Sequence, residues 1–379
     1  MLDFREKGNN ALLWLLIVYI LWTAAGLLGG GFINLYFRQA GVTLTELVAS
    51  VIFWAISPVL VIHLLEGRKL DMRAIMACGA IAVVLMYLAT ALMAPIAWLL
   101  YAMMFFFGTA SFMFWVPLNI MFFEFSKGRE AMFGSLYFAI NPVLGVFLPL
   151  IGGALAAAIG YQPIFLLTAL AYALVFPMVF LVLGKRTFTY RVGDSLDRLK
   201  GFKTLIFLEG TYGGGIIAAM GVIPLLYFTR PVDLGIYISV TTFFSVIASF
   251  IVSRLSDKSR KRKRYIEVFG SGLGVMTAIC SFAGTAFLWS LAASVRNFFS
   301  GLFYPFTTAI IMDNRRESVE GAFVGREWLL NIGRLLGASL VLFFTIVLGS
   351  IHLSLAMLGL AMVFYPVVLE LKRHHIRVD

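Results

Sequence analysis

Long apolar stretches follow one another along the whole chain, and short polar stretches separate them. Each is close to or above the roughly 20 residues that an α-helix needs to cross about 30 Å of hydrocarbon. Some connections are very short, such as residues 93–95 and 348–349, so their neighbours form antiparallel hairpins. The pattern predicts twelve membrane spans, at residues 11–37, 44–65, 72–92, 96–123, 131–155, 161–184, 203–228, 231–253, 264–284, 287–312, 320–347 and 350–371.

The two halves of the chain resemble each other. Landmarks recur at one constant offset: Leu35-Tyr36-Phe37 and Leu226-Tyr227-Phe228, Gly30 and Gly221, Glu66 and Asp257, Gly134 and Gly325. Six predicted spans separate equivalent positions, and this even number means that both halves cross the membrane in the same direction. We therefore predict an all-α membrane protein with parallel repeats: a six-helix bundle over residues 1–184, a cytoplasmic linker over 185–202 and a second six-helix bundle over 203–379.

Basic residues lie almost entirely on one side of the predicted spans. Lys and Arg collect at the N-terminus, on alternate connections and in the C-terminal tail, and only Arg38 and Arg230 lie on loops of the other side. Because these residues accumulate on cytoplasmic loops, we expect both termini in the cytoplasm and a multi-pass protein of the cell membrane. The first apolar stretch is too long for a cleavable signal peptide, so it is expected to stay as a span.

Composition excludes a soluble protein. Mean hydropathy is +0.94 and 13% of residues are charged, against about a quarter in soluble domains. The net charge of +11 centres on residues 258–264, which we interpret as a topology anchor that contacts anionic lipids and not nucleic acid. Cys78 and Cys280 are isolated and are expected to be small core residues. No phosphate loop, His-Glu metal motif or nucleophile elbow is present, so neither an enzyme nor a cofactor is predicted.

The loop after the eighth predicted span carries a recognisable motif. Residues 253–262 resemble the cytoplasmic G-x-L-x-D-R-x-G-R-K motif of the major facilitator superfamily, with Asp257 as its acid and Arg260 at its second glycine position. The copy after the second span, residues 66–69, keeps Gly-Arg-Lys but has Leu64 in place of the acid. The resemblance covers nearly the whole chain and implies a twelve-span carrier that works by alternating access, usually as a monomer. It also implies that Asp257 and Arg260, and less strongly Glu66 and Arg68, close the cytoplasmic side.

A second motif lies in the fifth predicted span. Gly145, Pro149, Gly152 and Gly153 resemble the G-P-x-x-G-G motif of proton-exchanging exporters in the superfamily, although Leu148 replaces its first glycine. This resemblance implies efflux by an antiporter. The alternative is that the small residues let two helices approach closely while Pro149 bends one of them. The superfamily's R-x-x-Q-G arginine is absent, because Met104 occupies its position before Gly108, so proton coupling through it is excluded.

Ionisable residues within spans are costly, by about 2.5–3.5 kcal/mol or more each, and usually face a cavity or a partner. Residues four or seven apart share a helix face, which places Glu327, Asn331 and Arg334 on one polar stripe. A second stripe consists of Arg296, Ser300 and Thr307, with Tyr304 near its edge. Arg296 and Arg334 are predicted to hold an anionic group of the substrate. The alternative is that they pair with Glu327 and Glu209 and only fix the packing. Arg326 is expected to be structural.

Other candidates complete the predicted site. Glu209, with Glu327, is the candidate for proton coupling, unless a neighbouring arginine holds it in a fixed pair. Gly213-Gly214-Gly215 indicates either a bending point or close packing. The first half is predicted to line the cavity with Tyr19, Thr23, Asn34, Trp115 and Asn119.

An apolar first half facing a cationic second half favours an amphipathic substrate. We expect a secondary active transporter that exports an amphipathic or anionic small molecule or lipid, with protons as a candidate coupling ion. Two alternatives stay open. One is an uptake carrier for a small metabolite, and the other is a non-transporting receptor or partner subunit of the same fold.

Overall fold

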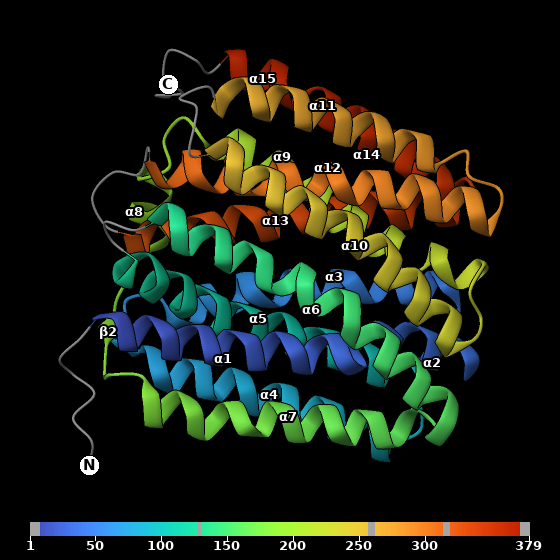
Figure 1. Cartoon of the computed structure of the whole chain (residues 1–379), viewed down its shortest axis with the longest axis horizontal. Coiled ribbons are helices and arrows are strands. Elements are labelled where there is room, and N and C mark those ends of the chain that lie inside the picture. Colours follow the sequence, from blue (N-terminus) through green and yellow to red (C-terminus); the bar gives the residue numbers. More distant parts are fainter. Residues whose placement is uncertain (1–7, 127–129, 257–261, 314–318, 372–379) are drawn as a thin grey trace.

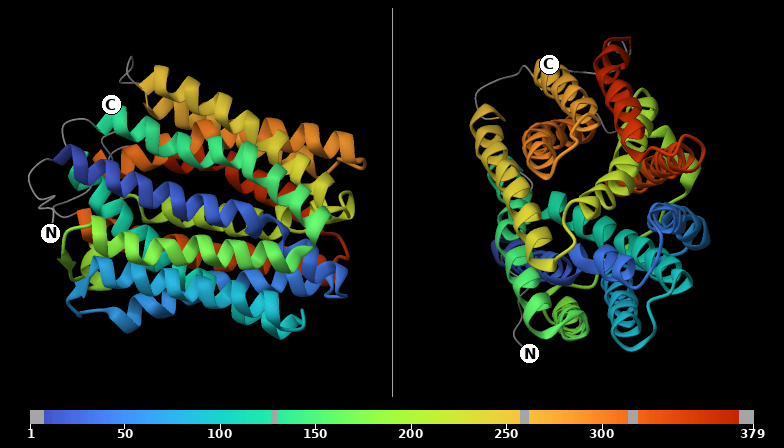
Figure 2. Two further views of the ribbon diagram at one scale, coloured as in Figure 1. Left: turned by 60° about the horizontal axis from the view of Figure 1, so that its bottom comes forward. Right: turned by 90° about the vertical axis from the view of Figure 1, so that its right-hand side faces the viewer.

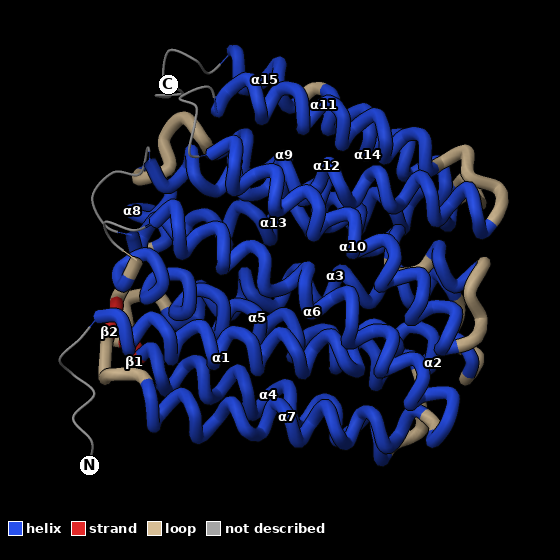
Figure 3. Tube along the Cα trace, in the orientation of Figure 1, coloured by secondary structure: helices blue, strands red, loops and turns tan. Residues whose placement is uncertain are grey.

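The computed structural model describes residues 8–126, 130–256, 262–313 and 319–371, and this part of the chain is almost entirely helical (Figure 3). The first half contains α1 (Gly8–Gly29), η1 (Gly30–Phe32), α2 (Ile33–Gln39), α3 (Leu44–Leu65), α4 (Met72–Leu92), α5 (Ala97–Phe125), α6 (Glu130–Ile159) and α7 (Tyr161–Val182). The second half contains α9 (Lys203–Met220), η2 (Ile223–Leu226), α10 (Pro231–Ser256), α11 (Arg262–Cys280), α12 (Ala286–Asp313), α13 (Val319–Val347), α14 (Ile351–Val363) and α15 (Tyr365–Leu371).

Local chemistry fixes several helix ends. Thr43 and Glu46 form a reciprocal capping box at the start of α3, in which the Thr43 side chain accepts from the Glu46 N–H and the Glu46 side chain accepts from the Thr43 N–H. Asp71 caps α4 by accepting from the Arg73 N–H at 2.9 Å. Gly160 and Gly349 have φ of +86° and +63°, which permits the tight turns between α6 and α7 and between α13 and α14.

The helices match the predicted spans closely. Among the described residues, ten helical segments are long and apolar enough to cross a membrane, so the all-α membrane fold is confirmed. The helices α11 and α12 fall outside this set, because α11 opens with three basic residues and α12 carries Arg296 and Asn297 in its middle. The predicted total of twelve crossings therefore stays a prediction.

The first spans of the two halves break at equivalent places. The α-helix α1 gives way to the 3-10 turn η1 at Gly30, and α9 ends at Met220, followed by Gly221 and the 3-10 turn η2. Gly30 and Gly221 are related by the sequence repeat, so the backbone carries the same repeat. The segments Ala11–Gln39 and Lys203–Leu226 are still long and apolar enough to cross a membrane, so the predicted spans over 11–37 and 203–228 hold, each with a local 3-10 turn.

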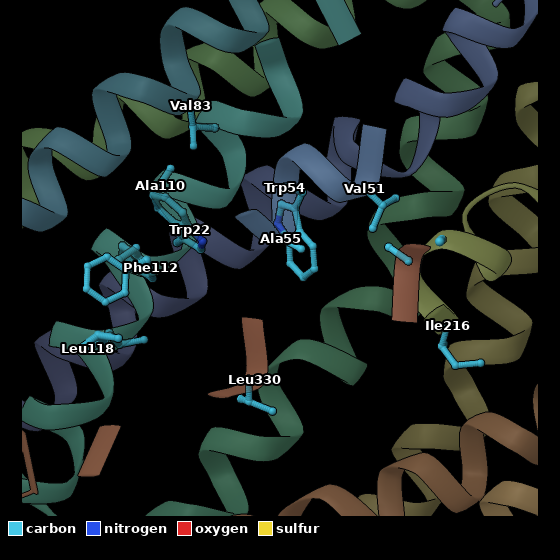
Figure 4. Packing of buried hydrophobic residues seen from close by; sticks show 14 of the residues in the cluster. Trp22, Val51, Trp54, Ala55, Val83, Ala110, Phe112, Leu118, Ile216 and Leu330 are labelled. Carbon is cyan, nitrogen blue, oxygen red and sulfur yellow. The ribbon is translucent and has the colours of Figure 1, made fainter. Parts of the chain in front are cut away.

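Two groups of helices meet along two seams. Within the first half α1 packs on α6 and α7, and α4 packs on α5 and α7; within the second, α9 packs on α13 and α14, and α11 packs on α12 and α14. The halves join where α6 lies along α10 and where α3 lies along α13 (Figures 1 and 2). Figure 4 shows Trp54 of α3 in one buried cluster with Leu330 of α13 and Ile216 of α9.

The linker folds at one end of the bundle. Strands β1 (Leu70–Asp71) and β2 (Thr187–Phe188) pair antiparallel, and the short helix α8 (Val192–Asp197) follows. These elements lie at the left in Figure 1, which we call the linker end, whereas α2 lies at the opposite, far end. The Tyr190 hydroxyl donates to the Ile62 carbonyl at 2.8 Å, and burial raises the pKa of Tyr190. The linker is therefore tied to the first half.

The outer surface is apolar. Large hydrophobic side chains such as Leu92, Trp98 and Leu181 are about three-quarters exposed, as lipid-facing residues are. Cys78 is exposed as well, so its prediction as a core residue is wrong, because its place on α4 turns it away from the packed face. Cys280 is buried, as predicted.

Glycines let α9 and α13 approach very closely. A Cβ atom on Gly214 would lie 2.2 Å from the Arg334 carbonyl oxygen, and one on Gly337 would lie 1.9 Å from the Thr211 carbonyl oxygen. Gly210 and Gly333 make matching contacts one turn earlier, so each helix presents two glycines four residues apart. Close packing is therefore what Gly214 and its neighbours provide in this conformation.

We expect Gly214→Ala to destabilise the protein by about 1–3 kcal/mol, because the added methyl group overpacks the contact with α13. Gly213→Ala is the matched control, since a Cβ atom there would meet nothing within 4 Å. The control should be neutral or slightly stabilising. Thermal unfolding of the purified variants in detergent measures both, and equal unfolding temperatures would contradict the close-packing account.

Candidate functional site

A chain of charged side chains connects α9 and α13 inside the second half. Arg326 Nη2 lies 2.6 Å from Glu209 Oε1, and its Nη1 lies 3.8 Å from Glu327 Oε1. Arg334 Nη1 lies 3.4 Å from Glu327 Oε2. Two carboxylates therefore face two guanidinium groups, and these four charges balance.

The polar stripe predicted on α13 is present. Asn331 donates to the Glu327 carbonyl oxygen at 2.7 Å and to the Glu327 carboxylate at 3.3 Å. Arg334 in turn donates to the Asn331 side-chain oxygen at 3.0 Å. One turn of helix separates neighbours in this series, so the helix spacing alone brings them together.

Arg334 also reaches the other half. Its guanidinium carbon lies 5.1 Å from the centre of the Trp54 ring on α3, a cation–π contact across the seam. Together with Glu327, this contact fits the packing alternative that the sequence left open for Arg334. Trp54 was not predicted as a contact of Arg334, because its neighbours in the sequence give no sign of a partner on α13.

Glu209 is 4% exposed and paired with Arg326, which is the fixed-pair alternative stated for it. The pair is incomplete. The second carboxylate oxygen, Oε2, and the Arg326 Nε atom are both enclosed, and neither has a hydrogen-bond partner among the described residues. This leaves Glu209 with capacity to take up a proton at the free oxygen.

Arg296 on α12 has a different environment. It is 6% exposed, and its Nε atom donates to the Tyr212 hydroxyl at 3.2 Å while Nη1 donates to Asn297 Oδ1 at 2.8 Å. The Tyr212 hydroxyl also hydrogen-bonds Thr277 at 2.7 Å, so a neutral network holds the guanidinium in place. No carboxylate pairs with Arg296 in the part of the chain that the structure describes. The predicted pairing with an acid is therefore not found for this arginine.

The other predicted residues of α12 lie nearby. Tyr304 is within electrostatic range of both Arg296 and Arg334, and Thr307 donates to its carbonyl oxygen at 3.0 Å. Ser300 is half-buried one turn from Arg296. The predicted residues of α12 thus follow one another along the same stretch of this helix. Their role in substrate binding stays a prediction.

In the first half, aromatic and amide groups form a second network. The Tyr137 hydroxyl donates to Asn119 Oδ1 at 2.6 Å, and the Tyr19 hydroxyl donates to the Tyr137 carbonyl at 3.2 Å. Trp115 meets the Tyr19 ring edge-on, with centroids 5.4 Å apart. Three of the predicted residues are therefore brought together, and Tyr137, which the sequence reasoning missed, connects them.

A cavity of about 320 Å³ lies within the first half. Its wall is mainly aromatic and aliphatic, with the predicted residues Thr23, Asn34 and Trp115 among its lining and Tyr19 and Asn119 outside it. The Thr23 side chain is buried and lies close to the Tyr19 hydroxyl. The lining also includes Trp22, Leu27, Met86, Tyr87, Met103, Met104, Phe107 and Tyr172. An apolar ligand body fits such a surface.

The halves contact each other at the far end. Asn34 donates to the Gly221 carbonyl at 2.9 Å, and Gln39 donates to the Thr229 carbonyl at 2.8 Å. Asn34 therefore joins the two helix breaks, besides lining the cavity.

The motif glycines of α6 lie in the close contacts of the bundle. A Cβ atom on Gly153 would lie 2.6 Å from the Pro231 carbonyl oxygen of α10, and one on Gly145 would lie 2.8 Å from the Thr242 side chain. Gly152 faces α1 instead, and the Pro149 carbonyl lies 2.4 Å from where a Cβ atom on Gly235 would be. Three of the four motif positions thus form the α6–α10 seam.

At the linker end the halves meet through His63 and Trp328. The Trp328 indole N–H donates to His63 Nε2 at 3.0 Å, and His63 Nδ1 lies 3.6 Å from Glu66 Oε2. The other Glu66 oxygen accepts from the Val192 N–H of the linker at 2.7 Å. Phe123 and Phe323 add a ring contact between the halves, with centroids 5.3 Å apart. Glu66 therefore binds the linker and supports the histidine.

Of the remaining latch residues, the structure describes only Arg68. Arg68 is exposed, and no ion pair is found for it among the described residues. Asp257 and Arg260 lie outside the described residues. Within the described ranges, no cluster of three or more His, Cys, Asp or Glu side chains has the arrangement of a metal site.

No protein-family model matches the sequence, and no curated protein matches it. Solved structures do match. A POT family transporter in complex with 5-aminolevulinic acid is 13% identical, with a TM-score of 0.72 over 95% of each chain. The human organic anion transporter MFSD10 (TETRAN) is 11% identical, with a TM-score of 0.69 over 96% of this chain and 100% of that one.

The E. coli fucose:proton symporter FucP is 14% identical, with a TM-score of 0.66 over 95% of this chain and 98% of that one. Identities this low speak for the fold and not for a shared substrate. Because each match covers nearly the whole length of both chains, the resemblance extends over both halves. The chain has the fold of the major facilitator superfamily transporters.

Proposed function

We propose that this protein is a secondary active transporter that works by alternating access and exports an amphipathic, anionic small molecule or lipid. One observation carries the proposal: an apolar aromatic cavity lies in one half, and a buried cationic centre lies in the other. A ligand with an apolar body and a negative group matches this division. The fold supports transport, and one solved neighbour is described as an organic anion transporter.

The two seams supply the moving parts. In this fold the halves rock about a central site, so contacts at the two ends break in turn. Asn34 with Gly221 would part when the far end opens, and His63 with Trp328 would part when the linker end opens. The distribution of basic residues supports placing the linker end in the cytoplasm.

The direction of transport is a separate part of the proposal. The partial exporter motif on α6 favours export, and its glycines form the α6–α10 seam. The alternative is uptake of a small metabolite, which is favoured by the similarity to a fucose:proton symporter. A non-transporting receptor of the same fold is the remaining alternative.

Solute counterflow in liposomes tests transport itself. We expect the purified protein to exchange an amphipathic anion across the membrane, and the same anion to raise its unfolding temperature, because a ligand that binds only the folded state stabilises it. A panel of anionic lipids, organic acids, neutral sugars and cationic drugs identifies the class. Stabilisation without counterflow for any compound would favour the receptor alternative.

Glu209 is the proposed proton carrier. Protonation at its free oxygen would remove the charge that holds Arg326 and so loosen α9 from α13. We expect Glu209→Gln to abolish transport driven by a pH gradient while counterflow continues, because exchange needs no net proton movement. Glu46→Gln, a carboxylate at the far end outside this network, is the control. Gradient-driven transport by Glu209→Gln at the normal rate would exclude this role.

The contact between His63 and Trp328 is the proposed latch of the linker end. We expect Trp328→Phe to raise the rate at which a cysteine placed at Phe323 reacts with a water-soluble maleimide, because the smaller phenyl ring stays aromatic but has no N–H to donate to His63. In a Cys78→Ser background, Trp98→Phe on the lipid-facing surface serves as the control.

Equal maleimide rates for Trp328→Phe and Trp98→Phe would rule out the latch.

A further inference from the structure

The buried charges of the second half do not balance. Glu209 and Glu327 neutralise Arg326 and Arg334, as the short ionic contacts among these four residues show. Arg296 is as deeply buried but has no acid among the described residues. The polar centre of the second half therefore carries one uncompensated positive charge, and this charge lies on Arg296.

Such a charge is costly, because an unpaired ion inside a protein has lost its hydration without gaining an opposite charge. The groups that hydrogen-bond Arg296 are the Tyr212 hydroxyl and the Asn297 side-chain amide, both of which are neutral. Their hydrogen bonds orient the guanidinium but do not neutralise it. An anion that binds there would remove the imbalance.

The Arg296 guanidinium also has N–H groups that no described residue accepts. Of its N–H groups, those on Nε and Nη1 meet Tyr212 and Asn297. Nη2 donates to no described atom, and it is not among the polar atoms that the protein encloses completely without a partner. One edge of Arg296 is thus held by the protein while another stays available.

Arg334 differs from Arg296 because its charge is already paired with an acid. Glu327 and Asn331 occupy its Nη1 atom, and Trp54 covers its ring-facing side across the seam. A ligand that took Arg334 would leave Glu327 with Arg326 as its sole cation, at the longer distance of 3.8 Å. Arg334 is therefore better suited to joining the halves than to binding an anion.

We propose that Arg296 alone binds the charged group of the substrate, and that this group carries a single negative charge, as a carboxylate, a sulfonate or a phosphodiester does. The proposal rests on the function proposed above and narrows it, because it assigns the charge of the substrate and separates the roles of the two arginines. A second negative charge on the ligand would find no free cation in this centre.

Four probes with one aromatic body test the charge rule: 2-naphthylacetate, 2-naphthylacetamide, 2-naphthylmalonate and 2-naphthylethylamine. Binding to the purified full-length protein in nanodiscs is measured by calorimetry at neutral pH. We expect the monoanion to bind roughly ten-fold or more tightly than the amide, since a charge-assisted hydrogen bond is about twice as strong as a neutral one. The dianion and the amine should bind less tightly than the monoanion.

Charge-matched variants separate the two arginines. Arg296→Gln should lose the preference for 2-naphthylacetate over its amide. The double variant Arg334→Gln with Glu327→Gln removes a balanced pair and should keep the preference. Arg296→Lys retains the charge without the planar fork, so it should keep the preference with weaker binding, and it provides a test if Arg296→Gln does not fold.

The proposal is overturned if the unmodified protein shows no preference for the monoanion, if the dianion binds most tightly, or if Arg296→Gln keeps the preference. Loss of the preference in the double variant also contradicts it. Counterflow separates this failure from failure of the transport function. If only a cation or a neutral solute shows counterflow, transport is upheld and the proposed preference for a monoanion is wrong. If the monoanion binds tightly without counterflow, the preference is upheld and the proposed transport function is wrong.

Discussion

The hydrocarbon core of a membrane supplies no hydrogen-bond partners, and this constraint governs the rest of the structure. Every backbone group must be paired within its own helix, which is why the described chain is almost wholly helical. Thr90 and Thr277 satisfy the same rule by donating to carbonyls one turn earlier. The buried charges of α9 and α13 pair with one another, whereas Arg296 is held by neutral acceptors and no acid pairs with it among the described residues.

Helices in lipid gain little from burying apolar surface, so contact depends on how closely their backbones can approach. Between α9 and α13 the approach is set by glycines four residues apart on both helices, and the ionic chain from Glu209 to Arg334 lies across the same contact. The seam between α6 and α10 is packed as closely, through Gly153 and Gly235, whereas the polar contacts described between the halves are neutral hydrogen bonds, such as the indole–imidazole bond at the linker end. Neutral hydrogen bonds of this kind would exchange more easily than the ionic chain if the halves moved against each other.

Sequence periodicity was sufficient for the spans and for the polar stripe of Glu327, Asn331 and Arg334, because both depend only on positions along one helix. It could not supply Tyr212 as the holder of Arg296, or Trp54 as the ring under Arg334. Those partners lie on other helices, at rotations that packing decides. For the same reason the sequence left two roles open for Glu209 and two for Arg334. It also placed Cys78 in the core, whereas this residue is exposed. The short breaks η1 and η2 were not predicted, because a 3-10 turn differs from an α-helix in its hydrogen bonding and not in its hydrophobic pattern.

The hydrogen bond between Asn34 and the Gly221 carbonyl joins the two helix breaks, one from each half. A continuous helix resists bending because several backbone hydrogen bonds would have to stretch together, whereas an interrupted one has already given some of them up. The short segments beyond the breaks, α2 and η2, can therefore bend more easily than the long helices α1 and α9. Such a segment can keep its neighbour's carbonyl paired through a range of tilts. The hydrogen bond of Asn34 to the Gly221 carbonyl would then survive small tilts of the halves and part only when the far end opens fully.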